Sequence, residues 1–299
     1  MAHRILRAFL GAMLTLAVSA AGGDIFYSTE KELALGRQLA LEVERQATLV
    51  HDPMIAPYVN RIGAILARQS DTRFPVTIRV IESRDVNALA LPGGFIFVNS
   101  GLIVRADDEA ELAGVIAHCV GDVAARHATR MATQSEVAQV GMVPLWFVSG
   151  WNAYSVYQAA NLLLPADLLR SSRAFVAEAD LLGLDYMYKA GYDPTAFVEM
   201  LEKVQAMEKK EPGTAAALYS THPPTAERIV AAEDHIRQFL KPRPESLVNT
   251  SDFDEIKARL PATPPPPRTH PTLRRSSEQE QAVAGDEDHP PTLKRPPTK

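Results

Sequence analysis

The chain has 299 residues, of which 46% are hydrophobic and 22% charged, a composition typical of a globular protein with a packed core. The formal net charge is −5 and no basic stripe occurs, which excludes a protein that binds nucleic acid through a basic surface. Cys119 is the single cysteine, so an internal disulfide is excluded as well.

Residues 1–20 have the layout of a secretory signal peptide. Arg4 and Arg7 form a short positive region, Ala8 to Val18 form an apolar run, and Val18-Ser19-Ala20 supplies small residues for cleavage. The run is short for a membrane span, and an uncleaved N-terminal anchor is the alternative. We therefore expect an exported protein, located in the periplasm or associated with the outer membrane.

Two helices are predicted to open the folded part. Thr29 and Glu32 have the spacing of a capping box and predict a helix that continues to about Thr48. Asp52-Pro53 starts a second helix, because proline suits the first helical turn. One face of this second helix carries the apolar residues Ile55, Val59, Ile62 and Leu66.

Short strands follow these helices. Residues 76–80 alternate apolar and polar side chains, which predicts a half-buried strand. The sequence Pro92-Gly93-Gly94 predicts a turn, and a strand is predicted directly after it over residues 95–98. With 86–91 as a third candidate strand, the pattern indicates a small sheet.

The second half of the chain is predicted to be helical. Asp107 or Asp108 can cap a helix over 109–130. Further helices are predicted over residues 172–190, 194–209 and 224–240. Gly191 is expected at the C-terminal cap of the first of these three, because glycine tolerates the left-handed conformation that ends many helices.

The segment 141–164 is apolar but interrupted by Pro144, Gly150 and Asn152, which argues against a helix that spans a membrane. We interpret it as a buried or lid-like helical hairpin. A peripheral contact with a membrane is the alternative.

The domain organisation follows from a change in composition towards the C-terminus. Residues 24–240 are predicted to form one folded domain, and 241–299 a proline-rich, charged tail. From Pro261 onward the chain has almost no apolar residues, so we expect this part to be disordered.

The segment 118–122, HCVGD, lies on the helix predicted over 109–130. Many zinc hydrolases carry His-Glu-x-x-His on a helix, where the two histidines bind one metal ion and the glutamate takes a proton from bound water. Compared with that pattern, His118 keeps the first ligand, Cys119 stands at the general base and Asp122 stands at the second ligand.

Four sequence blocks extend the comparison beyond this partial pattern: NALALPGGFIFVNSGLI, EAELAGVIAHCVGDVAARHATR, EADLLGLDYMYKAGYDP and STHPPTAERI. Their order and spacing resemble the secreted zinc metallopeptidases of the BepA/HtpX/Oma group, gluzincins related to the CAAX prenyl protease. The resemblance covers about residues 30–235. It implies a helix-rich α+β zincin fold with a small sheet beside the active-site helix, a zinc ion, and a polypeptide substrate in the cell envelope.

The resemblance also implies roles for residues on a second helix. The family's third ligand is the glutamate of a Glu-x-x-x-Asp motif, whose aspartate supports the first helix. Asp180 matches that aspartate, but Val176 stands where the glutamate is expected. Glu178 lies about 200° around the helix from Val176 and should face elsewhere. The zinc expected from the family is therefore predicted to be absent or weakly bound.

Several other residues match family positions. His222 is an extra candidate ligand that could complete a weak site with His118 and Asp122, with or without the Cys119 thiolate. His127 is interpreted as a packing residue or a support behind the ligands, and Arg228 as a salt-bridging support. The resemblance places Asn87, Pro92, Gly93 and Gly94 in the substrate groove; a tight turn is an equally good interpretation.

Three hypotheses about function remain open. The first is a pseudo-peptidase of the envelope quality-control type that binds polypeptides or acts as a scaffold, because HCVGD and Val176 remove the base and two ligands. The second is an active metalloendopeptidase with an atypical metal site. The third is an interaction protein that acts through its proline-rich tail.

Overall fold

The computed structural model describes residues 27–137, 166–210 and 223–260. The predicted signal peptide, the apolar segment 141–164, His222 and the tail from residue 261 lie outside the described residues.

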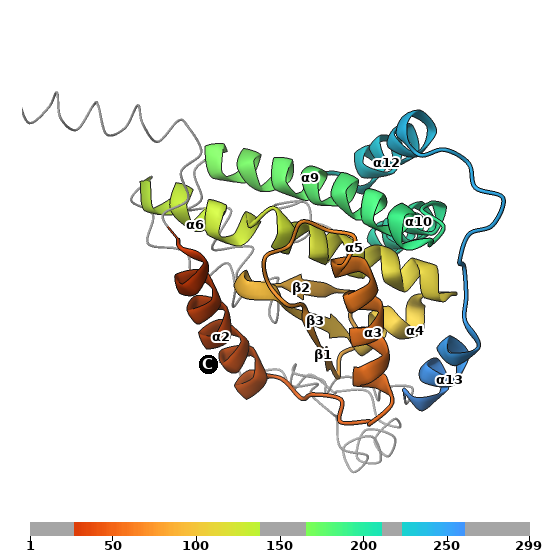
Figure 1. Cartoon of the computed structure of the whole chain (residues 1–299), viewed down its shortest axis with the longest axis horizontal. Helices are drawn as coiled ribbons and strands as arrows, with labels where there is room; N and C mark the ends of the chain where they lie inside the picture. Colours follow the sequence, from red (N-terminus) through yellow and green to blue (C-terminus); the bar gives the residue numbers. More distant parts are fainter. Residues whose placement is uncertain (1–26, 138–165, 211–222, 261–299) are drawn as a thin grey trace, which may run out of the picture. The chain divides into compact units, whose positions relative to one another are not determined.

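A three-stranded mixed sheet lies at the centre of the described fold (Figure 1). Its order is β1-β3-β2, with β1 (Thr77–Ile81) parallel to β3 (Phe95–Asn99) and β2 (Ala88–Ala90) antiparallel to β3. The three strands fall within one or two residues of the segments predicted from the sequence, 76–80, 86–91 and 95–98. With helices on both faces of this small sheet, the predicted helix-rich α+β fold is confirmed.

The two faces of the sheet belong to two apolar clusters, because successive side chains of a strand point to opposite sides. Helix α2 (Thr29–Gln46) covers one face, where Val43 packs with Phe97. On the other face, helices α3 (Ile55–Ala67) and α5 (Glu109–Ala124) pack over the main core. This main core includes Ile62, Leu66, Ile78, Val80, Ile96, Val98, Leu112 and Ile116.

The N-terminal cap of α2 differs from the predicted capping box. Ser28 is the capping residue, and its hydroxyl accepts a hydrogen bond from the Lys31 amide at 3.3 Å. Glu32 is buried, and its carboxylate accepts hydrogen bonds from Arg126 and Thr129 instead of turning back to the cap. The Glu32 carboxylate, which the local sequence predicted to cap α2, therefore binds the distant Arg126 guanidinium.

The helix predicted over 109–130 is broken in two. Helix α5 ends at Ala124, and α6 (His127–Val137) begins after Arg126, whose φ is 57°. A left-handed conformation costs a non-glycine residue about 1–2 kcal/mol. Hydrogen bonds of 2.6 Å from the Arg126 guanidinium to the Glu32 carboxylate and to the Tyr27 carbonyl oxygen hold it there. This tertiary contact, invisible in the local pattern, overrides helix propensity.

A helical layer completes the domain: α9 (Ala166–Ala190) runs along α5, and α10 (Thr195–Lys210) and α12 (Thr225–Phe239) pack beside them (Figure 1). Gly191 ends α9 with a φ of 93°, so the predicted glycine cap is confirmed. A short helix, α4 (Ser100–Arg105), follows β3 and was not predicted.

The domain boundary predicted at residue 240 is wrong. Helix α13 (Ser251–Arg259) packs against α3 and buries Phe253 and Ile256. In the segment before it, the Val248 carbonyl oxygen accepts a hydrogen bond of 2.9 Å from the Ala110 amide, at the start of α5. The sequence signal was weak, because only a few apolar residues, spaced three or four apart, punctuate a polar stretch.

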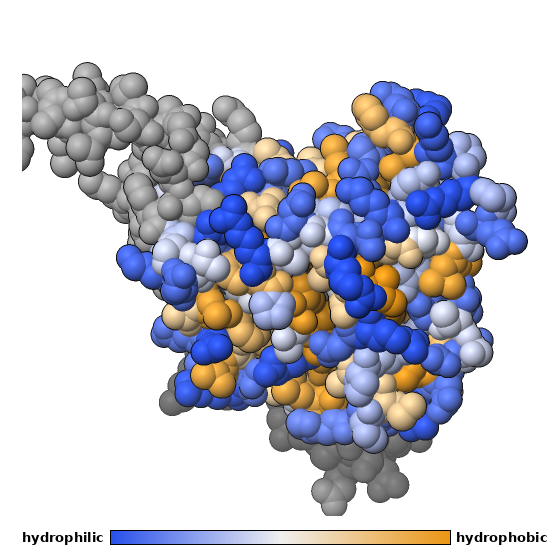
Figure 2. Space-filling model, viewed as in Figure 1, coloured by the Kyte–Doolittle hydropathy of each residue, from blue (hydrophilic) through white to orange (hydrophobic). Residues whose placement is uncertain are grey.

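On the face seen in Figure 2, hydrophobic residues (orange) lie between hydrophilic ones (blue). Among the residues that the structure describes, no helix combines the length and the apolar character needed to cross a membrane.

Candidate functional site

The candidate site lies where α5 crosses α9, and two glycines allow these helices to approach closely. A Cβ atom on Gly183 of α9 would lie 2.9 Å from the His118 amide nitrogen. A Cβ atom on Gly121 of α5 would lie 2.8 Å from the Ala179 carbonyl oxygen. Because any larger side chain would push the helices apart, the glycines place His118 opposite the residues of α9.

His118 and Asp180 meet at this crossing. His118 Nδ1 lies 2.7 Å from Asp180 Oδ1, and Arg228 of α12 donates two hydrogen bonds of 2.8 Å to the same carboxylate. Burial opposes ionisation of Asp180, but Arg228 and His118 outweigh it and hold the pKa of this carboxyl well below its usual range. Arg228 is thus the salt-bridging support that was predicted.

Asp122 lies between two histidines. Its Oδ2 is 3.5 Å from His118 Nε2, and its Oδ1 is 2.7 Å from His127 Nδ1. Burial disfavours a charged His118 ring, but the carboxylates of Asp122 and Asp180 outweigh burial and raise the pKa of His118. The ring nitrogen that would face a metal ion in a zinc hydrolase therefore faces a carboxylate of its own helix.

His127 continues this series of contacts away from the helix crossing. Its Nε2 lies 3.1 Å from Glu178 Oε2, and Arg130 of α6 donates to the same oxygen at 2.9 Å. Glu178 faces α6 and not His118, as its place around the helix predicted. Sequence reasoning missed the pairing of Glu178 with His127 and Arg130, because no short-range spacing connects α6 to α9.

Cys119 is 2% exposed, in the core on the inner face of α5. Burial, with a smaller contribution from Asp122, raises the pKa of its thiol far above the usual value. A thiol that stays protonated is neither a general base nor an effective nucleophile. The side chain packs as a small apolar residue.

Val176 is 8% exposed and lies one helical turn before Asp180, so the two residues share the face of α9 that packs on α5. An aliphatic side chain offers no lone pair to a metal ion. Among the described residues, His118 and Asp122 are therefore the two donors left where zinc needs three or four protein ligands, and this donor set does not fit a zinc centre.

The predicted substrate-groove residues separate into two groups. Pro92, Gly93 and Gly94 form a buried turn beneath α2, where a Cβ atom on Gly36 of α2 would lie 1.9 Å from the Pro92 carbonyl oxygen. This burial agrees with the tight-turn interpretation. Asn87 is exposed at the start of β2 and helps to line a shallow hollow of about 30 Å³.

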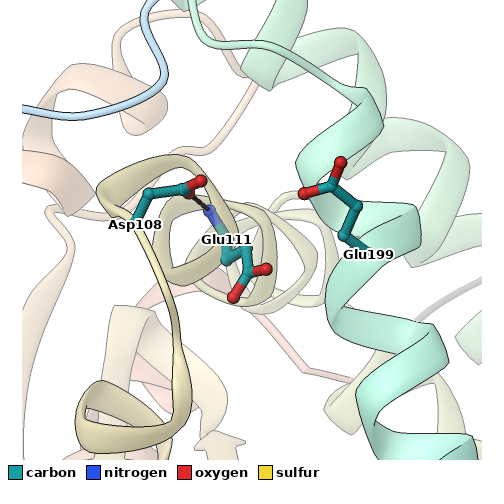
Figure 3. A group of neighbouring side chains, drawn as sticks. All are labelled: Asp108, Glu111 and Glu199. Atoms are coloured by element: carbon teal, nitrogen blue, oxygen red, sulfur yellow. Dashed lines mark hydrogen bonds between the residues drawn. The ribbon is translucent and has the colours of Figure 1, made fainter.

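A group of acidic side chains at the N-terminal end of α5 was not singled out from the sequence. Asp108, Glu111 and Glu199 bring one carboxylate oxygen each within 4.8 Å of one another (Figure 3). Asp108 caps α5 by accepting a 2.9 Å hydrogen bond from the Glu111 amide, and the Lys203 ammonium binds Glu111 at 2.6 Å. Helix capping and Lys203 thus account for Asp108 and Glu111, and oxygen donors alone are not the ligands that zinc favours.

Comparison with known proteins connects this geometry to a family. Residues 53–236 match the model of peptidase family M48. The chain is 28% identical over 247 residues to the beta-barrel assembly-enhancing protease of Escherichia coli K12. The matched region covers 78% of this chain and 48% of that relative. It is 29% identical over 208 residues to the metalloprotease LoiP of the same organism, and this match covers 68% of this chain and 78% of LoiP.

A eukaryotic relative is similar to the same extent. The mitochondrial metalloendopeptidase OMA1 of Schizosaccharomyces pombe is 27% identical over 237 residues, with 72% of this chain and 69% of the relative covered. The chain spans about half the length of the beta-barrel assembly-enhancing proteases that it matches. Since the family model covers more than half of its residues, the chain belongs to peptidase family M48.

Proposed function

We propose that this M48 chain is an exported protein of the cell envelope that binds polypeptides and has lost, or strongly reduced, the zinc-dependent proteolysis of its family. The observation that carries the proposal is Val176, an aliphatic side chain on the α9 face that packs on the site helix. The buried thiol of Cys119 supports it, because the position directly after His118, where the family carries its general base, has no carboxylate. The signal-peptide layout of residues 1–20 supports export.

Among the described residues, β2 is an edge strand of the sheet, and this edge supports polypeptide binding. The Asn99 amide donates to the Asn87 carbonyl at 3.0 Å, and the Leu91 amide donates to the Phe95 carbonyl at 2.8 Å. Because hydrogen-bonded pairs alternate along antiparallel strands, the backbone groups of Ala88 and Ala90 point away from β3. An extended polypeptide could pair with this edge, which lies beside α5 (Figure 1).

The metal content of the purified mature protein, measured together with casein hydrolysis, tests the loss of proteolysis. We expect substoichiometric zinc and no hydrolysis that a chelator abolishes. Stoichiometric zinc with chelator-sensitive cleavage would reject the proposal.

A restoring variant makes this test sharper. Cys119→Glu, Asp122→His and Val176→Glu together return the base and two ligands to the helix crossing, so we expect the triple variant to bind zinc. The matched control keeps Val176 and carries the other two changes; it should bind zinc more weakly because it lacks the third ligand.

Casein capture by β2 is tested with Ala90→Pro. Proline removes the outward amide without breaking the ladder to β3, so binding of casein should weaken several-fold. Ala90→Ser keeps the amide and serves as the control. Equal binding by both variants would show that this edge is not the binding surface.

One observation favours a second candidate, an active metalloendopeptidase with an atypical site. The 3.5 Å between His118 Nε2 and Asp122 Oδ2 is close to the spacing of about 3.4 Å between two ligands of a tetrahedral zinc ion. Such a site needs a third donor, and His222 is the candidate. His222→Ala should then abolish both zinc binding and casein cleavage.

A further inference from the structure

Seven side chains from four helices form one unbroken series of polar contacts through the candidate site. In order, they are Arg228, Asp180, His118, Asp122, His127, Glu178 and Arg130. The arginines close the two ends, and each histidine lies between two carboxylates. Every charged group along the series therefore has a neighbour of the opposite kind or a hydrogen-bonding ring.

Asp122 is the central member, and the series separates into two halves without it. On one side, His118 is fixed to Asp180 of α9 and through it to Arg228 of α12. On the other side, His127 is fixed to Glu178 of α9. Asp122 is the residue that joins the α5 histidine to the α6 histidine across the break at Arg126.

The rings on both sides of Asp122 are held in place by packing. The side chains of His118 and His127 are 13% and 6% exposed. The His127 ring stacks on Phe175 of α9 with a centroid distance of 4.7 Å. The Arg130 guanidinium also lies over the Phe175 ring, 4.4 Å from its centroid. A carboxylate between two immobilised rings gains its contacts with little loss of side-chain entropy.

We propose that Asp122 takes over the structural role of a metal ion, and that it joins α5, α6 and α9 by bridging His118 and His127. This inference rests on the proposed loss of the zinc centre, because the donors around His118 do not fit that ion. Asp122 is a positioning residue here: it holds two histidines and the helices that carry them.

Thermal unfolding of the full mature chain tests the bridge. Asp122→Ala leaves both rings without their shared acceptor, so the melting temperature should fall by about 5 to 10 °C. Asp185→Ala is the matched control, because Asp185 of α9 accepts a 2.8 Å contact from one histidine, His235. It should lower the melting temperature by about 2 °C or less. Equal shifts for the two variants would overturn the inference.

Hydrogen exchange separates a bridge from a general contribution to stability. With Asp122→Asn, one oxygen remains for one histidine, and the fold is easier to retain than with alanine. Amides of α6 should then exchange at least several-fold faster than in the wild type, while those of α3 remain unchanged. Faster exchange in both helices, or in neither, would contradict a local bridge.

Zinc and a chelator distinguish failure of the bridge from failure of the proposed function. If Asp122 replaces the metal, neither zinc nor the chelator shifts the melting temperature of the wild type. A zinc-dependent rise of several degrees overturns the bridge; when casein is also cleaved, the proposed function fails with it. If zinc has no effect and Asp122→Ala does not change the melting temperature, the bridge is overturned but the proposed function is not.

Discussion

The two ends of α5 hold carboxylates in two different ways. At the N-terminal end, Glu109 is 2% exposed and accepts hydrogen bonds from the hydroxyls of Tyr58 at 2.6 Å, Tyr192 at 2.7 Å and Thr250. At the C-terminal end, Asp122 lies between two histidines in a series that arginines close. Neutral donors satisfy one carboxylate, and ionisable groups satisfy the other.

This difference separates a structural anchor from a site that responds to its surroundings. Burial and the hydrogen bond to Glu109 raise the pKa of Tyr58 and Tyr192, so the hydroxyl donors stay protonated near neutral pH. At the other end, burial lowers the pKa of His118, but the carboxylates of Asp122 and Asp180 outweigh burial and raise it. The same helix therefore has hydroxyl donors that keep their protons at one end and a histidine with a raised pKa at the other.

The largest effect should come from removing the anchor. Glu109→Ala removes the acceptor of three hydroxyls, two of them on the buried Tyr58 and Tyr192, so the free energy of unfolding should fall by about 3 kcal/mol. Urea denaturation measures this change. Glu109→Gln keeps one acceptor oxygen and should cost about half as much. If Glu109→Ala lowers the free energy of unfolding no more than Glu109→Gln does, the hydroxyl network is not what stabilises this end of α5.

An intermediate effect is expected at the other end, from the close approach of α5 and α9. A methyl group on Gly183 would meet the His118 amide nitrogen at 2.9 Å, so Gly183→Ala should cost about 1–3 kcal/mol despite the better helix propensity of alanine. The matched control is Gly191→Ala, where no atom lies within 4 Å of the added Cβ and the penalty of about 1 kcal/mol comes from a positive φ. A stabilised Gly183→Ala would contradict the tight crossing.

The smallest effect concerns pH. A histidine whose pKa is raised on folding, such as His118, stabilises the protein below its unfolded pKa of about 6.5 and loses that contribution as the pH rises through the folded pKa. Unfolding free energy should therefore decline above about pH 6.5, by at most about 1.4 kcal/mol per pH unit.

Two variants assign this pH dependence to one end of α5. Asp122→Asn removes a carboxylate that raises the pKa of His118, so the decline should become shallower. Glu109→Gln should keep the slope of the wild type, since its partners are hydroxyls. Asp180, whose pKa is lowered, acts in the opposite direction: it stabilises the fold above about pH 3.9 and loses this contribution as the pH falls towards its folded pKa. If Asp122→Asn leaves the decline in unfolding free energy above about pH 6.5 unchanged, His118 is not the origin of that decline.

Local patterns predicted most of the elements that depend on local forces. Alternation found β1, the turn at residues 92–94 located β3, and Asp108, one of two predicted candidates, caps α5. Gly191 was found as a helix end. The break at Arg126 and the docking of α13 were missed, because both depend on partners far away in the sequence. Glu32 holds Arg126 from 94 residues away, a distance that no window of local sequence reaches.

By itself, the sequence determined the family, the α+β class and the residue types at the candidate site: a histidine, a cysteine, an aspartate and a valine at 118, 119, 122 and 176. These follow from residue order and helical spacing. Only the tertiary structure decided which groups meet. It joined His118 to Asp180, turned Asp122 towards His127 and paired Glu178 with α6, because the glycine-lined crossing of α5 and α9 fixes which faces oppose each other.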